Sequence, residues 1–405
     1  MSVLIAILGL GFLILIHEAG HFFTALAVGM RPRKFYIGFP PPLVRTRRKG
    51  IEYGIGSVPL GGYVKIPGMH RPAPGDIDLH FARAISERPE LFAATTLLRR
   101  RLEEGELDAA REELRRLEQV LADAKLSPLA RRAADRGLAE LGDALGRDAY
   151  WRQRTWRKVA VIIAGPGTNL ALAVVLFAAL YMIGGGKVTA TVDKVQAGKP
   201  AAQVGLRPGD RIVAIDGKRV TPPQIRERIM SSRGQPLELV VRRNGRSVVL
   251  GPVKPTKQQG AYRLGFVLRA KPLSAPAAMW QSVKLTGDLT KRTGAALAGI
   301  VHRKDRRQIS SPVGIVQGST EALHQGWETY LGLLAYLSLS LALLNLLPLL
   351  PLDGGHIAFS LVEGIRGRAV GRHVYERVSV VGMALVLMLF FIGLSNDVGR
   401  VVGGG

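Results

Sequence analysis

Four long apolar stretches constrain this chain more than any other feature of its sequence. They cover residues 3–28, 159–183, 330–352 and 378–394. A helix needs about 20 apolar residues to cross the hydrocarbon core of a bilayer. The composition agrees with this interpretation, because 47% of the 405 residues are hydrophobic and only 21% are charged. We therefore expect a polytopic α-helical membrane protein with four transmembrane helices.

The formal net charge is +25, and its distribution argues against a nucleic-acid partner. Seven basic and no acidic side chains fall within residues 31–50, and 17 basic against five acidic fall within residues 187–270. Neither block alternates with the stacking aromatics of a single-strand binder, and aromatics make up only 6% of the chain. The sequence contains no cysteine, which excludes disulfides, thiolate metal sites and cysteine nucleophiles.

Basic residues also orient the spans, because Lys and Arg accumulate in the short loops on the cytoplasmic side. The basic block at residues 31–50 follows the first span, and Arg152, Arg154, Arg157 and Lys158 precede the second. These positions predict a cytoplasmic loop between the first two spans and extracytoplasmic N- and C-termini. The basic region 187–270 then lies outside, which is consistent because long folded domains are translocated largely regardless of charge.

The regions between the spans differ in character. Residues 51–67 alternate apolar and polar side chains around Pro59 and the glycines at 61 and 62, which predicts a β-hairpin. Residues 71–158 carry 18 basic and 16 acidic side chains with Leu and Ala at helical spacing, as expected of a solvated helical module. The run 201–217, with its Pro-Gly-Asp and Asp-Gly turns, resembles part of a PDZ domain.

These features divide the chain into nine expected segments. They are the first transmembrane helix at 1–30, a basic cytosolic loop with a membrane-associated β-hairpin at 31–70, a cytosolic helical insertion at 71–158, the second transmembrane helix at 159–184, a mixed α/β PDZ domain at 187–270, an amphipathic helical linker at 271–327, the third transmembrane helix at 328–353, a cytosolic loop at 354–377 and the fourth transmembrane helix at 378–396. Within the linker, an amphipathic helix is expected at about residues 275–305, running from Pro276 through the basic cluster Arg303, Lys304, Arg306 and Arg307.

The first span contains a candidate metal site, the sequence His-Glu-x-x-His. His17 and His21 are four residues apart, so a helix places both imidazoles on one face, as two ligands of one zinc ion require. Glu18 lies about 100° further round the helix, where it can reach a water on the metal. Chance alone produces such a motif in roughly one per cent of chains like this. Each ionisable group at mid-bilayer costs about 2.5 to 3.5 kcal/mol, which disfavours an accidental occurrence.

A catalytic zinc site needs a third protein ligand, and Asp353 is the candidate. It ends a segment in which Pro348 and Pro351 prevent regular helix. Irregular backbone at membrane depth is tolerated where it faces protein or a water-filled cavity. The alternative is an ordinary aspartate before a Gly-Gly turn.

Together these motifs resemble the site-2 protease family of intramembrane zinc metalloproteases, in its bacterial form with an extracytoplasmic PDZ domain. The residues that match the family's motifs are His17, Glu18, His21, Asn345, Pro348, Asp353 and Gly354. Further similarities are residues 61–65, like the family's β-loop, residues 164–169 in the second span and residues 312–315 before the third. The chain departs from many relatives in having one PDZ domain instead of two, and in the helical insertion, whose role the resemblance leaves open.

The resemblance implies an endopeptidase that uses one Zn²⁺ to cut single-span membrane proteins at a bacterial inner membrane, with its active site toward the cytoplasm. The implied roles are zinc ligation by His17, His21 and Asp353, and acid-base catalysis by Glu18. Asn345 would position the substrate backbone or act catalytically as a donor to the developing oxyanion, and Pro348 would help to bind the substrate. The implied substrate-binding strand is Gly61, Gly62, Tyr63 and Val64. The PDZ domain would bind a peptide or an acidic segment, or act as a size filter.

Several alternatives remain open from the sequence. A zinc-binding pseudoprotease or non-proteolytic scaffold would present the same PDZ domain, although it has no need of the base Glu18. Asn345 alternatively forms a hydrogen bond between helices, and the hairpin alternatively packs against the first span. Asn169 is expected to make a structural contact between spans two and three. His356 is expected to be an interfacial residue.

Overall fold

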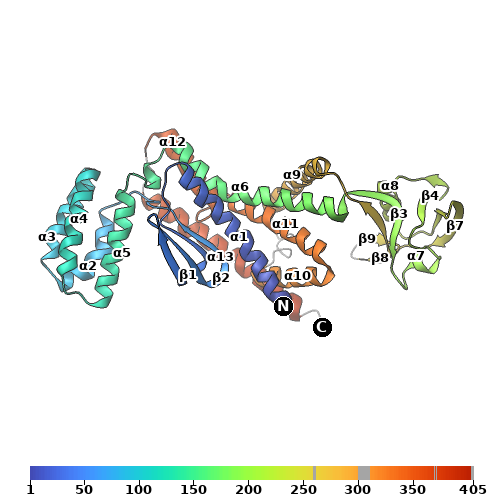
Figure 1. Cartoon of the computed structure of the whole chain (residues 1–405), viewed down its shortest axis with the longest axis horizontal. Coiled ribbons are helices and arrows are strands. Elements are labelled where there is room, and N and C mark those ends of the chain that lie inside the picture. The colour runs from blue at the N-terminus through green and yellow to red at the C-terminus, as the bar shows by residue number, and fades with distance from the viewer. Residues whose placement is uncertain (259–260, 300–310, 369, 371, 403–405) are drawn as a thin grey trace. The chain divides into compact units, whose positions relative to one another are not determined.

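The computed structural model describes residues 1–258, 261–299, 311–368, 370 and 372–402. The chain divides into two compact units, Met1–Ala173 with Leu289–Gly405, and Val174–Asp288. The first unit holds the candidate site and the spanning helices, except for residues 174–185 of the second span, which belong to the second unit (Figure 1). The predicted basic cluster at 303–307 lies outside the described residues.

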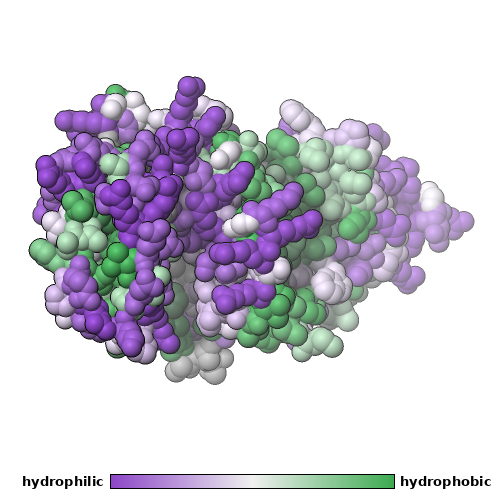
Figure 2. All heavy atoms as spheres, turned by 60° about the vertical axis from the view of Figure 1, so that its left-hand side comes forward, coloured by the Kyte–Doolittle hydropathy of each residue, from purple (hydrophilic) through white to green (hydrophobic). Residues whose placement is uncertain are grey.

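The four predicted spans are helices in the structure. They are α1 (Ser2–Ala27), α6 (Thr155–Leu180) with its π-helical continuation Tyr181–Gly185, α11 (Trp327–Asn345) and α13 (Arg372–Val402). Each is long and apolar enough to cross a membrane. Two further helices, α9 (Ala275–Gly299) and α10 (Pro312–Gln325), precede α11. Figure 2 shows hydrophobic residues gathered over the spanning helices of the first unit.

The third span is shorter than its apolar stretch predicts. It ends at Asn345, because Pro348 and Pro351 lack the N–H that a helix interior requires. A new helix, α12 (Asp353–Arg366), begins at Asp353 and is followed by Gly367 in the left-handed conformation. The segment 354–377, expected as a loop between spans three and four, is therefore helical for most of its length. The glycines at 354 and 355, which suggested a turn, instead pack against the backbone of residues 346–350.

The predicted hairpin is part of a larger β-structure. Strands β1 (Lys34–Arg48) and β2 (Ile51–Lys65) meet at a turn formed by Lys49 and Gly50, where Arg48 pairs with Ile51. Residues 34–37 pair with residues 52–55 and also with residues 62–65. The arms of the expected 51–67 hairpin thus lie on either side of β1. The basic block at 31–50, expected to be a loop, is mostly strand.

Aromatic and β-branched residues explain why the basic block extends into a strand. Phe35, Tyr36 and Ile37 favour extended backbone, and Tyr36 is completely buried. Its hydroxyl donates to Glu52. Strand β2 packs along α1 (Figure 1), so the sheet lies beside the helix that carries the His-Glu-x-x-His sequence.

The insertion is a four-helix module with its own core. Its helices are α2 (Gly75–Glu87), α3 (Leu91–Glu104), α4 (Leu107–Asp123) and α5 (Pro128–Leu145). Leucines at helical spacing meet in this core, whose centre includes Phe81, Leu98 and Leu117. Hydrophilic side chains predominate on the face that Figure 2 turns forward, with hydrophobic residues between them.

Ion pairs attach this module to the β-structure. Arg33 donates to Asp143 at 2.7 Å and to Asp148 at 2.8 Å, and Lys65 lies 2.9 Å from Asp143. Two backbone bonds from residues 150 and 151 to residues 67 and 68 join the same regions. These contacts fix α5 beside the end of β2.

The second unit contains a mixed α/β domain. Its elements are β3 (Lys187–Val195), α7 (Pro200–Gln203), β4 (Arg211–Ile215), β5 (Lys218–Arg219), α8 (Pro222–Ser231), β6 (Leu237–Arg243), β7 (Arg246–Val253), β8 (Thr256–Gln258), β9 (Ala261–Arg263) and β10 (Phe266–Lys271). The sheet order is β10-β3-β4-β6-β7, with β5 paired to β4, while β8 pairs with β9. Fourteen buried apolar residues form one core against this sheet. The assignment as a PDZ domain stays a prediction from the sequence.

Candidate active site

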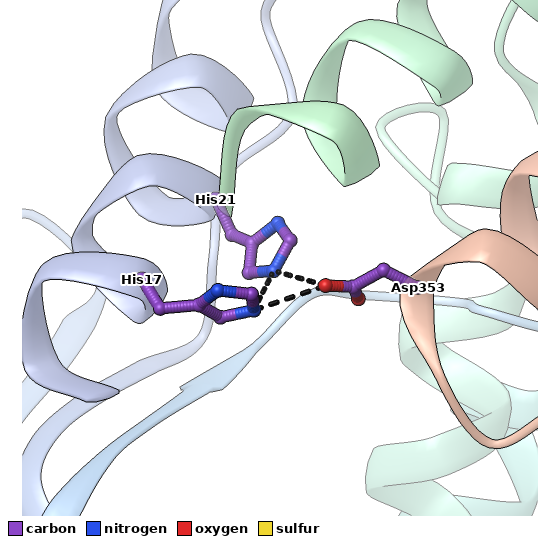
Figure 3. A group of neighbouring side chains, drawn as sticks. All are labelled: His17, His21 and Asp353. Atoms are coloured by element: carbon purple, nitrogen blue, oxygen red, sulfur yellow. Dashed lines mark hydrogen bonds and ion pairs between the residues drawn. The ribbon is translucent and has the colours of Figure 1, made fainter. Parts of the chain in front are cut away.

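Three side chains from two distant parts of the chain converge in the first unit (Figure 3). His17 and His21 come from α1, and Asp353 comes from the first turn of α12. The Oδ2 atom of Asp353 lies 2.9 Å from Nε2 of His17 and 3.4 Å from Nε2 of His21. The two Nε2 atoms are 3.2 Å apart. The structure therefore brings together all three residues that the sequence analysis proposed as zinc ligands.

These separations suit a zinc ion. Zinc binds nitrogen and oxygen donors at about 2.0 to 2.1 Å in a tetrahedron, which places neighbouring donors about 3.3 Å apart. The observed separations of 2.9, 3.2 and 3.4 Å surround that value. Both imidazoles are buried. The group fits a metal with three protein ligands and one open position.

Helix α6 holds the far side of both imidazoles. The Nδ1–H group of His21 donates to the carbonyl of Val161 at 2.8 Å, which leaves its Nε2 lone pair for a metal. Nδ1 of His17 lies 3.4 Å from the side-chain amide of Asn169. The backbone carbonyl of Asn169 also accepts a hydrogen bond from Ser338 of α11 at 2.8 Å. Asn169 thus contacts span three through its backbone carbonyl, whereas its side chain faces His17 in span one, which the sequence did not reveal.

Gly165 of α6 is a second residue whose role the sequence analysis missed. A β-carbon at this position would overlap Nε2 of His21 and lie 2.8 Å from Nε2 of His17. Only glycine leaves the space that a metal between these nitrogens requires. The signal was present in the Gly-Pro-Gly run within an apolar span, because glycine in a helix interior costs about 1 kcal/mol relative to alanine.

Glu18 lies next to β2. The backbone N–H of Val64 donates to its Oε2 atom at 3.2 Å. A β-carbon at Gly62 would lie 3.2 Å from Cβ of Glu18, and one at Gly61 would overlap Ile14. Gly61 also has a φ of +84°, which favours glycine. The two glycines therefore let β2 approach the helix closely enough to hold the Glu18 carboxylate.

A cavity of about 1000 Å³ contains this site. The imidazole pair, Glu18 and Asp353 line it together with Asn345. Pro348 is exposed and is not among the lining residues. The neighbouring β2 residue Tyr63 also lines the cavity, and burial raises the pKa of its phenol.

The helical module forms part of the cavity wall. The contributing residues are Asp76, Leu79 and His80 of α2 and Glu140, Leu141, Asp143 and Ala144 of α5. Nε2 of His80 lies 3.1 Å from Glu140, which joins the two helices at this wall. The sequence predicted the module but gave no sign that it borders the site.

The fold and the site define a membrane protein in which two buried imidazoles and a partly buried aspartate could hold a metal beside a further carboxylate, a donor set typical of a metalloprotease. The chain matches the sequence model described as Peptidase family M50 over residues 5–389, and it belongs to this family. The membership confirms the predicted site-2 protease family, the enzyme class of zinc metalloprotease and the Zn²⁺ cofactor.

The chain is similar to named metalloproteases over most of their lengths. The chain is 30% identical to "Putative zinc metalloprotease Atu1380" of Agrobacterium fabrum, over 98% of this chain and 95% of the relative. It is 27% identical to metalloprotease MmpA of Caulobacter vibrioides, over 96% and 94%. It is 28% identical to zinc metalloprotease Rip1 of Mycobacterium tuberculosis, over 87% and 83%.

Proposed function

We propose that this protein is an intramembrane zinc endopeptidase that cuts single-span membrane proteins within or beside their transmembrane segment. His17, His21 and Asp353 are the zinc ligands in this proposal, and Glu18 is the general base. The observation that supports it most is the convergence of three donor atoms at tetrahedral spacing among helices long enough to cross a membrane. The location follows as an inner membrane, with both termini extracytoplasmic and the site toward the cytoplasm.

Glu18 performs the proton transfers in this mechanism. A zinc ion bound by the trio would polarise the scissile carbonyl and lower the pKa of a water to about 7. The Glu18 carboxylate takes a proton from the attacking water and delivers it to the leaving amine nitrogen. The N–H group of Val64 fixes this carboxylate beside the ligands. A pseudoprotease or scaffold has no use for a base held in this way.

The substrate must be extended before it is cut, because a helix locks its peptide groups in hydrogen bonds. We assign this role to Gly61, Gly62, Tyr63 and Val64. Residues 62–65 pair with 34–37 on one side, and the N–H of Val64 points away from that partner to Glu18. The opposite strand edge thus faces the catalytic carboxylate, where an extended segment adds by main-chain pairing.

Asn345 and Pro348 take different parts in substrate positioning. Asn345 is among the residues that line the cavity, and in this proposal its amide donates to the substrate carbonyl as negative charge develops on the carbonyl oxygen. Pro348 lies outside the lining and acts indirectly, because it ends the helix and lets the chain turn back toward Asp353.

The two inserted regions control access in this proposal. Substrate residues next to the cut pass along the wall formed by α2 and α5. The PDZ domain at 187–270 either holds a peptide or acidic segment, which its 17 basic against five acidic side chains favour, or excludes bulky external portions.

Glu18→Gln tests the function directly. We expect the variant to bind zinc as the unchanged chain does and to leave a co-expressed single-span reporter protein uncut, because the amide cannot accept the proton. Glu118→Gln, on the exposed surface of α4, is the matched control and retains cleavage. Cleavage of the reporter by Glu18→Gln at the control's rate contradicts the mechanism.

A further inference from the structure

The side chain of Asn169 lies beside a proposed zinc ligand without an evident reason to be polar. It is completely buried in α6. Its amide nitrogen is 3.4 Å from Nδ1 of His17, and its Oδ1 atom has no hydrogen-bond partner among the described residues. A buried polar group without a partner is unusual and calls for an explanation.

The chemistry of imidazole supplies that explanation. A histidine that binds a metal through Nε2 carries its single ring proton on Nδ1. The group on His17 that faces Asn169 is therefore an N–H donor. The nitrogen of the Asn169 amide is itself a donor and cannot accept a hydrogen bond from it. The oxygen and nitrogen of an asparagine amide are assigned from their hydrogen-bond partners. Rotating the amide group by half a turn about the χ2 angle places Oδ1 toward His17. The Nδ1–H group of His17 can then donate a hydrogen bond to this oxygen.

We propose that Asn169 is a positioning residue that accepts a hydrogen bond from Nδ1–H of His17 and so directs the Nε2 lone pair of His17 at the metal. The contact is the counterpart of the 2.8 Å bond from His21 to the carbonyl of Val161. Both acceptors belong to α6, so this one helix sets the tautomer and ring orientation of both imidazoles on α1. The inference rests on the proposed ligand role of His17.

Two variants of Asn169 separate this role from simple packing. Asn169→Leu keeps a similar volume but removes the acceptor, and we expect zinc affinity to fall about 10-fold to 100-fold. Asn169→Asp keeps an oxygen acceptor facing the ring, and we expect affinity within about threefold of the unchanged chain. A packing role predicts the opposite order, because a buried position among apolar helices tolerates leucine better than a carboxylate.

Zinc affinity is measured on the full chain in detergent by competition with a chelator, which is independent of cleavage. Ser338→Ala is the matched control, because it removes the hydrogen bond to the backbone carbonyl of Asn169 and leaves the side chain in place. Its zinc affinity should be unchanged. The proposal is overturned if Asn169→Leu binds zinc as tightly as the unchanged chain does. It is also overturned if Asn169→Asp binds zinc more weakly than Asn169→Leu does.

Two further outcomes are decisive. Where Asn169→Leu fails to fold, Asn169→Asp alone decides, since a 10-fold loss of affinity in that variant overturns the proposal and retained affinity supports it. His17→Leu tests the foundation separately. Zinc affinity unchanged in His17→Leu would show that His17 is not a ligand, and the proposed function would fall together with the role of Asn169.

Discussion

The backbone of Gly165 lies directly against Nε2 of His21, so that any side chain at position 165 would occupy the space between the two imidazoles. Helix α6 thus shapes the site by the absence of a side chain at Gly165 as well as by the hydrogen-bond acceptors that it provides. Residues 161–169 of this helix face the metal-binding sequence of α1 through Val161, Gly165 and Asn169. The site is therefore a product of two packed spans as much as of the His-Glu-x-x-His sequence.

Gly165→Ala should abolish tight zinc binding. The added methyl group would overlap Nε2 of His21, while alanine otherwise favours a helix by about 1 kcal/mol over glycine. Gly167→Ala is the matched control, because a β-carbon there meets nothing within 4 Å. Metal content of the purified chains after dialysis measures the effect. Equal zinc in both variants would mean that the metal lies elsewhere.

Asp353→Asn should weaken zinc binding by at least about 10-fold, since it replaces an anionic ligand with a neutral one. The exposed Asp135→Asn variant in α5 changes the net charge by the same amount and should bind zinc normally. Chelator competition measures both affinities. If Asp353→Asn retained the affinity of the control, the third ligand would be a different residue.

Acid should destabilise the mixed α/β domain through one ion pair. Arg243 donates to both oxygens of the buried Asp210 at 2.7 and 2.6 Å, and these bonds hold the pKa of that carboxyl below its usual range. A carboxyl with a lowered pKa stabilises the fold above its unfolded pKa of about 3.9, and this contribution is lost as the pH falls further. Limited proteolysis of the full chain between pH 7 and pH 3 should show this loss.

Substitution of the arginine isolates that contribution. Arg243→Gln should destabilise the domain at pH 7 by about 3 kcal/mol, because it leaves the buried Asp210 carboxylate without its charged partner. The variant should also lose less stability than the unchanged chain as the pH falls. Arg269→Gln breaks the exposed 3.3 Å pair with Asp193 and should cost less than about 1 kcal/mol. Equal effects of the two variants would contradict the assigned role of the buried pair.

A single cysteine at Leu79 tests the wall formed by the helical module. The chain has no cysteine of its own, so Leu79→Cys in the Glu18→Gln background carries one site for a photo-crosslinker. Leu79 is 68% exposed and lines the catalytic cavity. We expect it to cross-link a single-span reporter. Leu97→Cys, exposed on α3 away from the cavity, should not, and equal cross-linking from both sites argues against the wall.

The sequence predicted the parts of the site that local geometry determines. The spacing of His17 and His21 fixes their common face once the segment is a helix. The chemistry of zinc required one more donor, and Asp353, the residue proposed for it, lies beside both imidazoles in the structure. The side-chain direction of Asn169 was beyond such reasoning. It depends on the rotation of α6 against α1, and an apolar span without a periodic polar face carries no signal for that rotation.

The β-structure was likewise predictable from the sequence only in part. Alternation at 51–67 indicated extended chain, and the structure has a strand there. Alternation does not identify the partner strand, which here is residues 34–37 between the two arms. The basic side chains and the three prolines at 40–42 suggested a loop, so the strand was not predicted.

His17 and Asp353 enter the molecule at very different moments of its synthesis. About 330 residues separate them, which at 5 to 20 residues per second is on the order of half a minute of translation. Until α12 has left the ribosome, the imidazole pair lacks the carboxylate that faces it at 2.9 Å. A nascent chain in which α12 has not yet been synthesised therefore lacks one of the three donors of the proposed zinc site.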